Sequence, residues 1–289
     1  MAKRRWRILA GLGLALLAVL VALAAVYVAT IWRPQFLTPT ARASHADFMA
    51  SGLELVTPPG PGPFPTVLLI HGCGGLRGPY EPNPIMDEYA ASAVKAGWAA
   101  AILDSYAPRD WEARWARIRV CSGLRLRGFH RAADVLAGLD VLQHDRRVDT
   151  RHLRIASWSH GGWAVGDLLT LRDPGDGSFR RTMSQVEAIY FTYPFCAFPS
   201  QGRRRDWTWK GDVRWVFAEH DTVQSQAGCM PMVERARRAG ARTDIVVFPG
   251  VTHAFDERLT TPDSTFRFDP QVAARAHAEF ITWLQTPAA

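Results

Sequence analysis

Acidic residues are missing from the first 33 residues of the chain, which contain five basic ones: Lys3, Arg4, Arg5, Arg7 and Arg33. Because these five account for most of the formal net charge of +7, the rest of the chain is close to neutral. A surface of that kind is ordinary for a globular protein, whereas a nucleic-acid partner calls for a basic patch. The sequence therefore gives no reason to expect a nucleic-acid partner.

Charge of either sign is absent from the long apolar run between Ile8 and Trp32. A helix of that length, rising about 1.5 Å per residue, spans a bilayer core of roughly 30 Å. Basic residues on its N-terminal side predict that this end of the chain stays in the cytoplasm. We therefore predict a basic cytoplasmic tail over residues 1–7, a transmembrane anchor over residues 8–32 and a linker over residues 33–46.

The alternative to an anchor is a cleaved signal peptide. The apolar core of a signal peptide is normally about 7–15 residues long, which is shorter than the run found here. The small residues of Ala41–Ala43 nevertheless offer a cleavage site. With an anchor, the protein is a single-pass membrane protein whose main domain is periplasmic or otherwise extracytoplasmic. The excess of arginine over lysine indicates a bacterial source.

Cysteine is sparse, and no Cys-x-x-Cys pair or Cys/His spacing typical of a zinc site occurs. An even number of cysteines in an exported protein favours disulfides. We expect the pairs Cys73–Cys121 and Cys196–Cys229, because the members of each pair follow neighbouring strands of the predicted sheet. The alternative is that some or all of these cysteines are free and buried.

Internal repeats and low-complexity tracts are also absent, and short apolar runs instead alternate with segments of helical periodicity. This alternation predicts an α/β fold: a mostly parallel sheet with helices on both faces, over residues 47–289. The predicted strands are Leu53–Pro58, Thr66–Gly72, Trp98–Tyr106, Leu153–Ser159, Val186–Phe195, Val213–His220 and Thr243–Gly250. The predicted helices are Ile85–Ala96, Arg127–His144, a segment after Gly162, Gln226–Ala239 and Pro270–Leu284.

Three residues with catalytic chemistry follow three of these strands. Ser159 ends one strand, Asp221 follows another, and His253 comes soon after a third. Active sites of parallel sheets gather at the carboxyl ends of the strands, and the chain order Ser, Asp, His is that of α/β-hydrolases. Ser159 also lies between the small residues Ser157 and Gly161, as a sharp strand-to-helix turn requires.

The expected roles follow from acyl-transfer chemistry. His253 takes the proton of Ser159, and Asp221 orients the imidazole. The oxyanion requires preformed N–H donors, for which we expect the backbone of His160 and of Cys73, with Gly74 next. No metal or organic cofactor is expected.

Each assignment has an alternative. Ser159 can cap a helix, and His253 can be a solvated loop residue. Asp221 can be a turn residue, in which case Glu219 or Asp212 is a weaker candidate for the acid. Cys73 is itself a possible nucleophile, but it lies on the loop expected to bind the oxyanion.

The segments "LLIHGCGG", "ILDSYAPR", "IASWSHGG", "FAEHD" and "FPGVTHAFD" together resemble the dienelactone hydrolase family, over roughly residues 48–285. The resemblance implies an α/β-hydrolase that acts on esters or lactones without a cofactor, and it supports Ser159, Asp221 and His253 as a triad. Founding members have a cysteine nucleophile and a glutamate in the loop that corresponds to His71–Gly75. This chain has neither, so the dienelactone substrate does not carry over.

Substrate contacts are expected from Arg109, in "DSYAPR", and from Trp158, beside the candidate nucleophile. An arginine can bind a substrate carboxylate in a bidentate manner. The alternative for Arg109 is a structural ion pair with Asp104. The basic, aromatic loop from Arg203 to Trp209 can touch anionic lipid head groups, or it is simply solvated.

The sequence as a whole predicts a serine hydrolase that cleaves small carboxylic esters or lactones through an acyl-serine intermediate. One alternative is a peptidase or acyltransferase on the same scaffold. Another is an inactive, hydrolase-like binding module of the cell envelope. The oligomeric state is left open.

Overall fold

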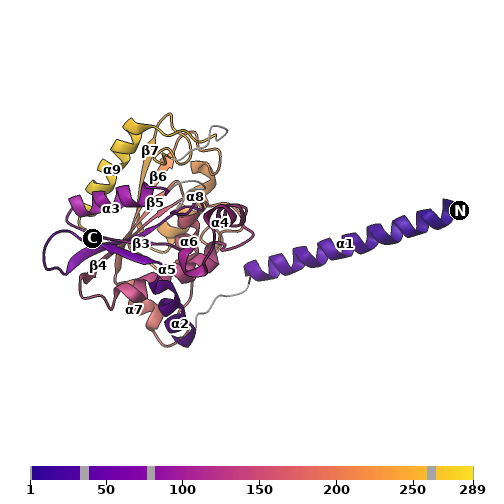
Figure 1. The fold of residues 1–289 in the computed structure, drawn as a ribbon, viewed down its shortest axis with the longest axis horizontal. Helices are drawn as coiled ribbons and strands as arrows, with labels where there is room; N and C mark the ends of the chain where they lie inside the picture. Colours follow the sequence, from indigo (N-terminus) through magenta and orange to yellow (C-terminus); the bar gives the residue numbers. More distant parts are fainter. Residues whose placement is uncertain (1, 33–38, 77–81, 259–264, 289) are drawn as a thin grey trace. The chain divides into compact units, whose positions relative to one another are not determined.

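Figure 1 shows a central sheet with helices on both sides. Among the described residues the sheet has seven strands in the order β1-β3-β2-β4-β5-β6-β7. Only β1 is antiparallel to its neighbour, so the predicted mostly parallel sheet is confirmed. The structure, a computed structural model, describes residues 2–32, 39–76, 82–258 and 265–288. The strands are β1 (Leu53–Val56), β2 (Phe64–Ile70), β3 (Ala99–Leu103), β4 (Val148–Trp158), β5 (Val186–Thr192), β6 (Asp212–Ala218) and β7 (Arg242–Phe248).

Helices cover both faces of this sheet, and each face has its own apolar core. Alternate residues of β2 enter opposite cores: Leu68 and Ile70 one, Val67 and Leu69 the other, as the period of two in a strand requires. One core is closed by α3 (Ile85–Lys95) and α9 (Pro270–Gln285). The other is closed by α2 (Pro39–Ala50), α5 (Gly128–Leu142), α6 (His160–Leu168), α7 (Ser178–Ser184) and α8 (Gln226–Arg238).

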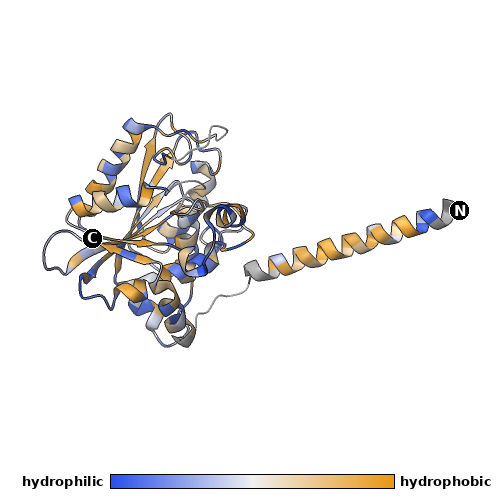
Figure 2. Ribbon diagram, viewed as in Figure 1, coloured by the Kyte–Doolittle hydropathy of each residue, from blue (hydrophilic) through white to orange (hydrophobic). Residues whose placement is uncertain are grey.

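The N-terminal helix α1 (Ala2–Trp32) belongs to a separate unit, Met1–Gln35, whereas the sheet lies in the unit Phe36–Ala289. Within α1, the stretch Arg5–Val28 is long and apolar enough to cross a membrane. Figure 2 shows it as an almost unbroken hydrophobic helix. A membrane anchor and a signal sequence share this property.

The predicted linker over residues 33–46 is wrong in its second half, and residues 33–38 lie outside the described residues. Helix α2 begins at Pro39. Its Arg42 forms an ion pair with Asp140 of α5 and donates to Thr182 Oγ1 at 2.9 Å. The sequence "PTARASHA" has no apolar period, and contacts with distant residues specify this helix instead.

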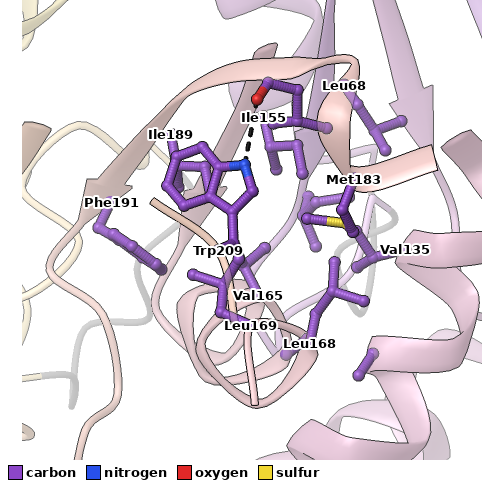
Figure 3. Packing of buried hydrophobic residues seen from close by; sticks show 14 of the residues in the cluster. Leu68, Val135, Ile155, Val165, Leu168, Leu169, Met183, Ile189, Phe191 and Trp209 are labelled. Atoms are coloured by element: carbon purple, nitrogen blue, oxygen red, sulfur yellow. Dashed lines mark hydrogen bonds between the residues drawn. The ribbon is translucent and has the colours of Figure 1, made fainter. Parts of the chain in front are cut away.

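The loop before β6 turns its tryptophans inward. Trp207 and Trp209 are 6% and 7% exposed and belong to one apolar core. Figure 3 shows Trp209 packed among Val165, Leu169 and other residues of this core. The indole of Trp209 donates to the carbonyl of Val186 at 3.1 Å. Of the two interpretations of this loop, contact with lipid therefore does not involve its tryptophans, which are buried.

Two disulfides join Cys73 to Cys121 and Cys196 to Cys229, which is the predicted pairing. Cys121 ends a helix missed in the sequence, α4 (Ala113–Cys121). Cys229 lies in α8. The first disulfide therefore joins α4 to the loop after β2.

Candidate active site

Ser159 occupies the turn between β4 and α6 in a conformation unusual for a residue with a side chain. Its φ is 51° and its ψ is −114°, a region that costs roughly 1–3 kcal/mol for a residue other than glycine. The surroundings hold it there, because its N–H donates to Thr192 O at 3.0 Å and its carbonyl accepts from Phe195 N at 3.0 Å. Strain of this kind typically marks a functional position.

The small residues around Ser159 are required by close approach of neighbouring backbone. A Cβ added to Gly161 would lie 2.3 Å from the carbonyl oxygen of Ile70, at the end of β2. A Cβ on Gly162 would lie 2.4 Å from Pro194 Cβ. Ser157 is accommodated as well, because its buried hydroxyl donates to Tyr190 O at 3.2 Å.

Gly161→Ala is expected to lower the free energy of unfolding by about 1–3 kcal/mol, the usual cost of overpacking, and to lower kcat as well. The start of α6 must move away from β2, and it takes Ser159 with it. Chemical denaturation and ester hydrolysis measure the two effects. Gly138→Ala in α5 is the matched control, because its nearest neighbours lie 3.4 Å from the added Cβ. Equal effects of the two substitutions would contradict the argument.

The structure brings Ser159, His253 and Asp221 together as a chain of hydrogen bonds. His253 Nε2 is 2.8 Å from Ser159 Oγ, and Nδ1 is 2.7 Å from Asp221 Oδ2. The second oxygen of Asp221 accepts from the N–H groups of Val223 and Gln224, both at 2.8 Å. Because Asp221 accepts at Nδ1, that nitrogen carries the proton and Nε2 is left to accept from the serine.

The loop that carries His253 is held by a buried carboxyl group that the sequence analysis missed. Asp256 accepts from Tyr89 Oη at 2.7 Å and from Tyr193 Oη at 2.5 Å. Burial raises the pKa of Asp256 above its ordinary value. The ring of Tyr193 also packs 4.7 Å from that of His253. The histidine loop is thereby joined to α3 and to the end of β5.

The loop after β2 lies beside Ser159, as the proposed oxyanion donors require. A Cβ on Gly72 would lie 3.4 Å from Ser159 Cβ. The carbonyl of Cys73 accepts from Tyr106 Oη at 2.9 Å, so the peptide between Cys73 and Gly74, which carries the Gly74 N–H, is constrained. No contact places the N–H groups of Cys73, Gly74 or His160 on a ligand, and their role stays a prediction.

Two histidines near the site, His71 and His160, make structural contacts and are not part of the Ser159–His253–Asp221 chain. His71 Nδ1 is 2.6 Å from Gly72 O, and burial lowers its pKa to about 4, which keeps it neutral. The His160 ring is buried with Nδ1 3.2 Å from Arg131 Nη1, and burial also lowers its pKa. His220 is exposed.

A cavity of about 490 Å³ opens in front of Ser159 and His253. Cys73, Gly74 and Trp158 are among its lining residues. The Trp158 ring is almost fully buried against Tyr89, with centroids 4.4 Å apart, and its substrate contact stays a prediction. The other lining residues are Gly72, Gly75, Asn83, Ile85, Met86, Arg117, Ile118, Cys121, Tyr193, Val223, Ala254, Glu257 and Phe266.

Arg109 is not among the residues that line this cavity. Its guanidinium donates to both oxygens of Asp134, at 2.8 and 3.1 Å, and to Ser105 O at 2.6 Å. The predicted contact with a substrate carboxylate is therefore wrong. The structural ion pair is present instead, with Asp134 in place of the expected Asp104.

The cavity contains a carboxyl group that the sequence did not point to. Glu257 follows His253 by four residues and accepts from Asn83 Nδ2 at 2.7 Å. Burial raises its pKa, and the neighbouring Asp256 adds to this, whereas Arg117, Asn83 and His253 act in the opposite direction. The motif "FPGVTHAFD" ends one residue before Glu257, and nothing in the sequence indicates that this side chain faces the cavity.

Glu257→Gln is expected to raise kcat/KM for a carboxylate-bearing ester roughly tenfold relative to a neutral ester of the same size. The reason is that repulsion between the Glu257 carboxylate and a substrate carboxylate, across a partly solvated cavity, costs on the order of a kcal/mol or more. The effect should grow as pH rises through the pKa of Glu257, because only the ionised group repels an anion. Kinetics on the matched ester pair measure it. The control is Glu54→Gln on β1, which is exposed and outside the cavity lining. An unchanged ratio would contradict the prediction.

Comparisons with known proteins agree with this architecture. The model of the dienelactone hydrolase family matches residues 53–287. No curated protein matches the chain. Among the described residues, no group of histidine, cysteine, aspartate and glutamate is placed to hold a metal ion.

Several solved structures share the fold at low sequence identity. A dienelactone hydrolase-like promiscuous phosphotriesterase from metagenomic libraries is 17% identical, with a TM-score of 0.62 over 82% of this chain and 92% of that one. A putative dienelactone hydrolase from Klebsiella pneumoniae is 16% identical, with a TM-score of 0.58 over 81% and 92%. A thermophilic esterase from Thermogutta terrifontis, with propionate bound, is 17% identical, with a TM-score of 0.55 over 80% and 89%. From the match over residues 53–287, the chain belongs to the dienelactone hydrolase family.

Proposed function

We propose that this protein is a serine hydrolase that cleaves small carboxylic esters or lactones through an acyl-serine intermediate. The observation that carries the proposal is the hydrogen-bonded chain Ser159–His253–Asp221, which starts at a strained turn and faces a cavity. A binding module has no need of this combination. The cavity of about 490 Å³ falls in the size range of small-molecule sites.

Acylation begins when Ser159 Oγ attacks the carbonyl carbon of the ester and its proton passes to His253 Nε2. The buried Asp221 stabilises the imidazolium that forms. The oxyanion of the tetrahedral intermediate accepts hydrogen bonds from the backbone N–H of His160 and of Cys73 or Gly74. The intermediate collapses, the bond to the leaving alkoxide breaks, and His253 gives its proton to the departing alcohol.

Deacylation repeats these steps with water as the nucleophile. His253 Nε2 takes a proton from the water as its oxygen attacks the acyl carbon. Collapse of the second tetrahedral intermediate releases the carboxylic acid and returns the proton to Ser159 Oγ. With a lactone, the leaving alcohol stays attached to the acyl group, so one product carries both functions.

We also propose that α1 anchors the enzyme with its N-terminus in the cytoplasm and the hydrolase domain outside. The apolar stretch Arg5–Val28 and the basic residues before it support an anchor. The two disulfides support an oxidising compartment, because such bonds rarely persist in the cytoplasm.

A fluorophosphonate probe tests the catalytic proposal without a guess at the substrate. Such probes phosphylate activated serines. One solved structure of the esterase from Thermogutta terrifontis contains the enzyme phosphorylated by paraoxon. We expect the oxidised, full-length protein to form one adduct at Ser159, located by peptide mass spectrometry. His253→Ala should lose the adduct or form it much more slowly, whereas His220→Ala, which changes an exposed histidine, should label normally.

The result also separates the alternatives. Folded protein that forms no adduct, even with a smaller probe, would overturn the proposal in favour of an inactive binding module. Labelled protein that cleaves amides faster than esters, or transfers its acyl group to an added alcohol rather than to water, would identify a peptidase or an acyltransferase.

A further inference from the structure

Helix α4 and the turn after it carry exposed apolar and basic side chains, and one of them, Ile118, also lines the cavity. Trp115, Ile118 and Leu124 are 57%, 53% and 69% exposed. Arg114, Arg119 and Arg125 of the same segment are exposed as well. The guanidinium of Arg119 lies 5.8 Å from the centroid of the Trp115 ring. We call these six residues the α4 platform.

The other side of α4 is fixed by packing and by a disulfide. Ala116 and Val120 on the inner side of α4 are buried in a small core with Tyr106 and Leu126. Residue Cys121 ties the end of the helix to the loop after β2 through its disulfide. Helix α4 therefore already packs on a core through its buried side. The exposed residues of the platform are not needed for that packing.

The turn after α4 is equally well defined. Gly123 has a φ of 71°, the left-handed conformation that ends many helices. The N–H groups of Leu124 and Arg125 both donate to Arg119 O at 3.0 Å. Leu124 is therefore exposed on an ordered turn. Exposure of such a large apolar side chain to water does not stabilise the fold, whereas its burial would be favourable.

The charged residues of the segment that carries the platform, from Ala113 to Ala133, are all basic. The sequence has no acidic residue between Glu112 and Asp134, a stretch that contains six arginines. Asp110 and Glu112 are exposed just before α4 and offset part of this charge at its N-terminal end. Segments that lie in the interface of an anionic bilayer have this composition, with exposed tryptophan, leucine and isoleucine side chains among arginines.

We propose that the α4 platform docks on an anionic lipid surface. The apolar side chains enter the boundary between head groups and acyl chains, and the arginines contact lipid phosphates. The same helix supplies Arg117, Ile118 and Cys121 to the lining of the cavity, so docking brings the cavity wall to the lipid. Esters that partition into the membrane are then the favoured substrates. That last step rests on the proposed esterase activity, whereas the docking does not.

Hydrogen exchange of the full-length protein in nanodiscs tests the docking independently of catalysis. Peptides that cover residues 111–127 should exchange about tenfold more slowly with 30% phosphatidylglycerol than with phosphatidylcholine alone, since arginines are attracted to an anionic lipid surface. The triple variant Arg114→Glu, Arg119→Glu, Arg125→Glu should lose this difference, as should high salt.

A matched triple variant, Arg146→Glu, Arg172→Glu, Arg238→Glu, changes the net charge equally at exposed positions outside the platform, and it should keep the difference. Equal exchange in the two kinds of nanodisc would overturn the proposal. Slower exchange in both, unaffected by the platform substitutions, would overturn it as well, because the arginines would then not be the cause. A protein with no esterase activity but with the exchange difference would separate the docking from the proposed function.

Discussion

Ser159→Ala is expected to lower kcat for ester hydrolysis by at least about a thousandfold, because triad members act as a unit whose loss leaves only binding and oxyanion stabilisation. The hydroxyl is the only part removed, and the backbone contacts of this residue with Thr192 and Phe195 remain. The free energy of unfolding should therefore change little. Steady-state kinetics on a chromogenic ester and chemical denaturation measure the two quantities.

Two further variants sharpen this result. His253→Ala should cause a loss of similar size, and the double variant should be no slower than the slower single one, since the two residues serve the same step. Ser157→Ala, two residues before the nucleophile, is the matched control and should keep most of the activity. Substantial activity in Ser159→Ala would mean that the hydrolysis occurs elsewhere on the protein.

Asp167→Ala is expected to lower the free energy of unfolding by about 3–5 kcal/mol, because it leaves several buried donors without an acceptor. Asp167 lies in α6, the helix that follows Ser159. One carboxyl oxygen accepts from the N–H groups of Gln201 and Gly202, at 2.5 and 3.0 Å, and from Ser200 Oγ at 3.2 Å. The other accepts from Trp163 Nε1 at 2.9 Å. The carboxyl group thus joins α6 to the loop before β6.

The same residue predicts a pH dependence. Burial raises the pKa of Asp167 to about 7, although its hydrogen bonds act in the opposite direction. The folded state therefore keeps a proton that the unfolded state releases near its ordinary pKa of about 3.9. The free energy of unfolding should fall as pH rises from about 4 to about 7 and then level off.

Urea denaturation at several pH values checks both effects. Asp167→Ala should be less stable than the wild type throughout, and its stability should lack the decline between pH 4 and 7 that this group causes. Asp206→Ala is the control, because Asp206 is highly exposed and its ion pair with Arg235 is worth little. A loss in Asp167→Ala no larger than in this control would contradict the role given to the carboxyl group.

The parts of the site that could be read from the sequence are those determined by short segments. Ser159, Asp221 and His253 each follow a strongly apolar run by a few residues, and parallel strands bring their carboxyl ends to one edge. The disulfide pairing came from the same placement on neighbouring strands. The family resemblance rested on the same motifs.

The parts that failed depend on contacts between distant residues. Helix α2 exists because Arg42 reaches Asp140, which is far along the chain. The arginine of "DSYAPR" was recognised, but its partner Asp134 could be found only once α5 was in place. Whether Trp209 faces lipid or core, and whether Glu257 faces the cavity, depends on packing that no local pattern encodes.

The disulfide between Cys73 and Cys121 has a mechanical consequence. Its two α-carbons are 5.1 Å apart, so the loop beside Ser159 cannot move independently of the end of α4. A force on that helix, from a surface or a partner, reaches the loop beside Ser159 through a covalent bond rather than through side-chain contacts that can shift. The two parts respond as one body while the bond is intact, and as two bodies after its reduction.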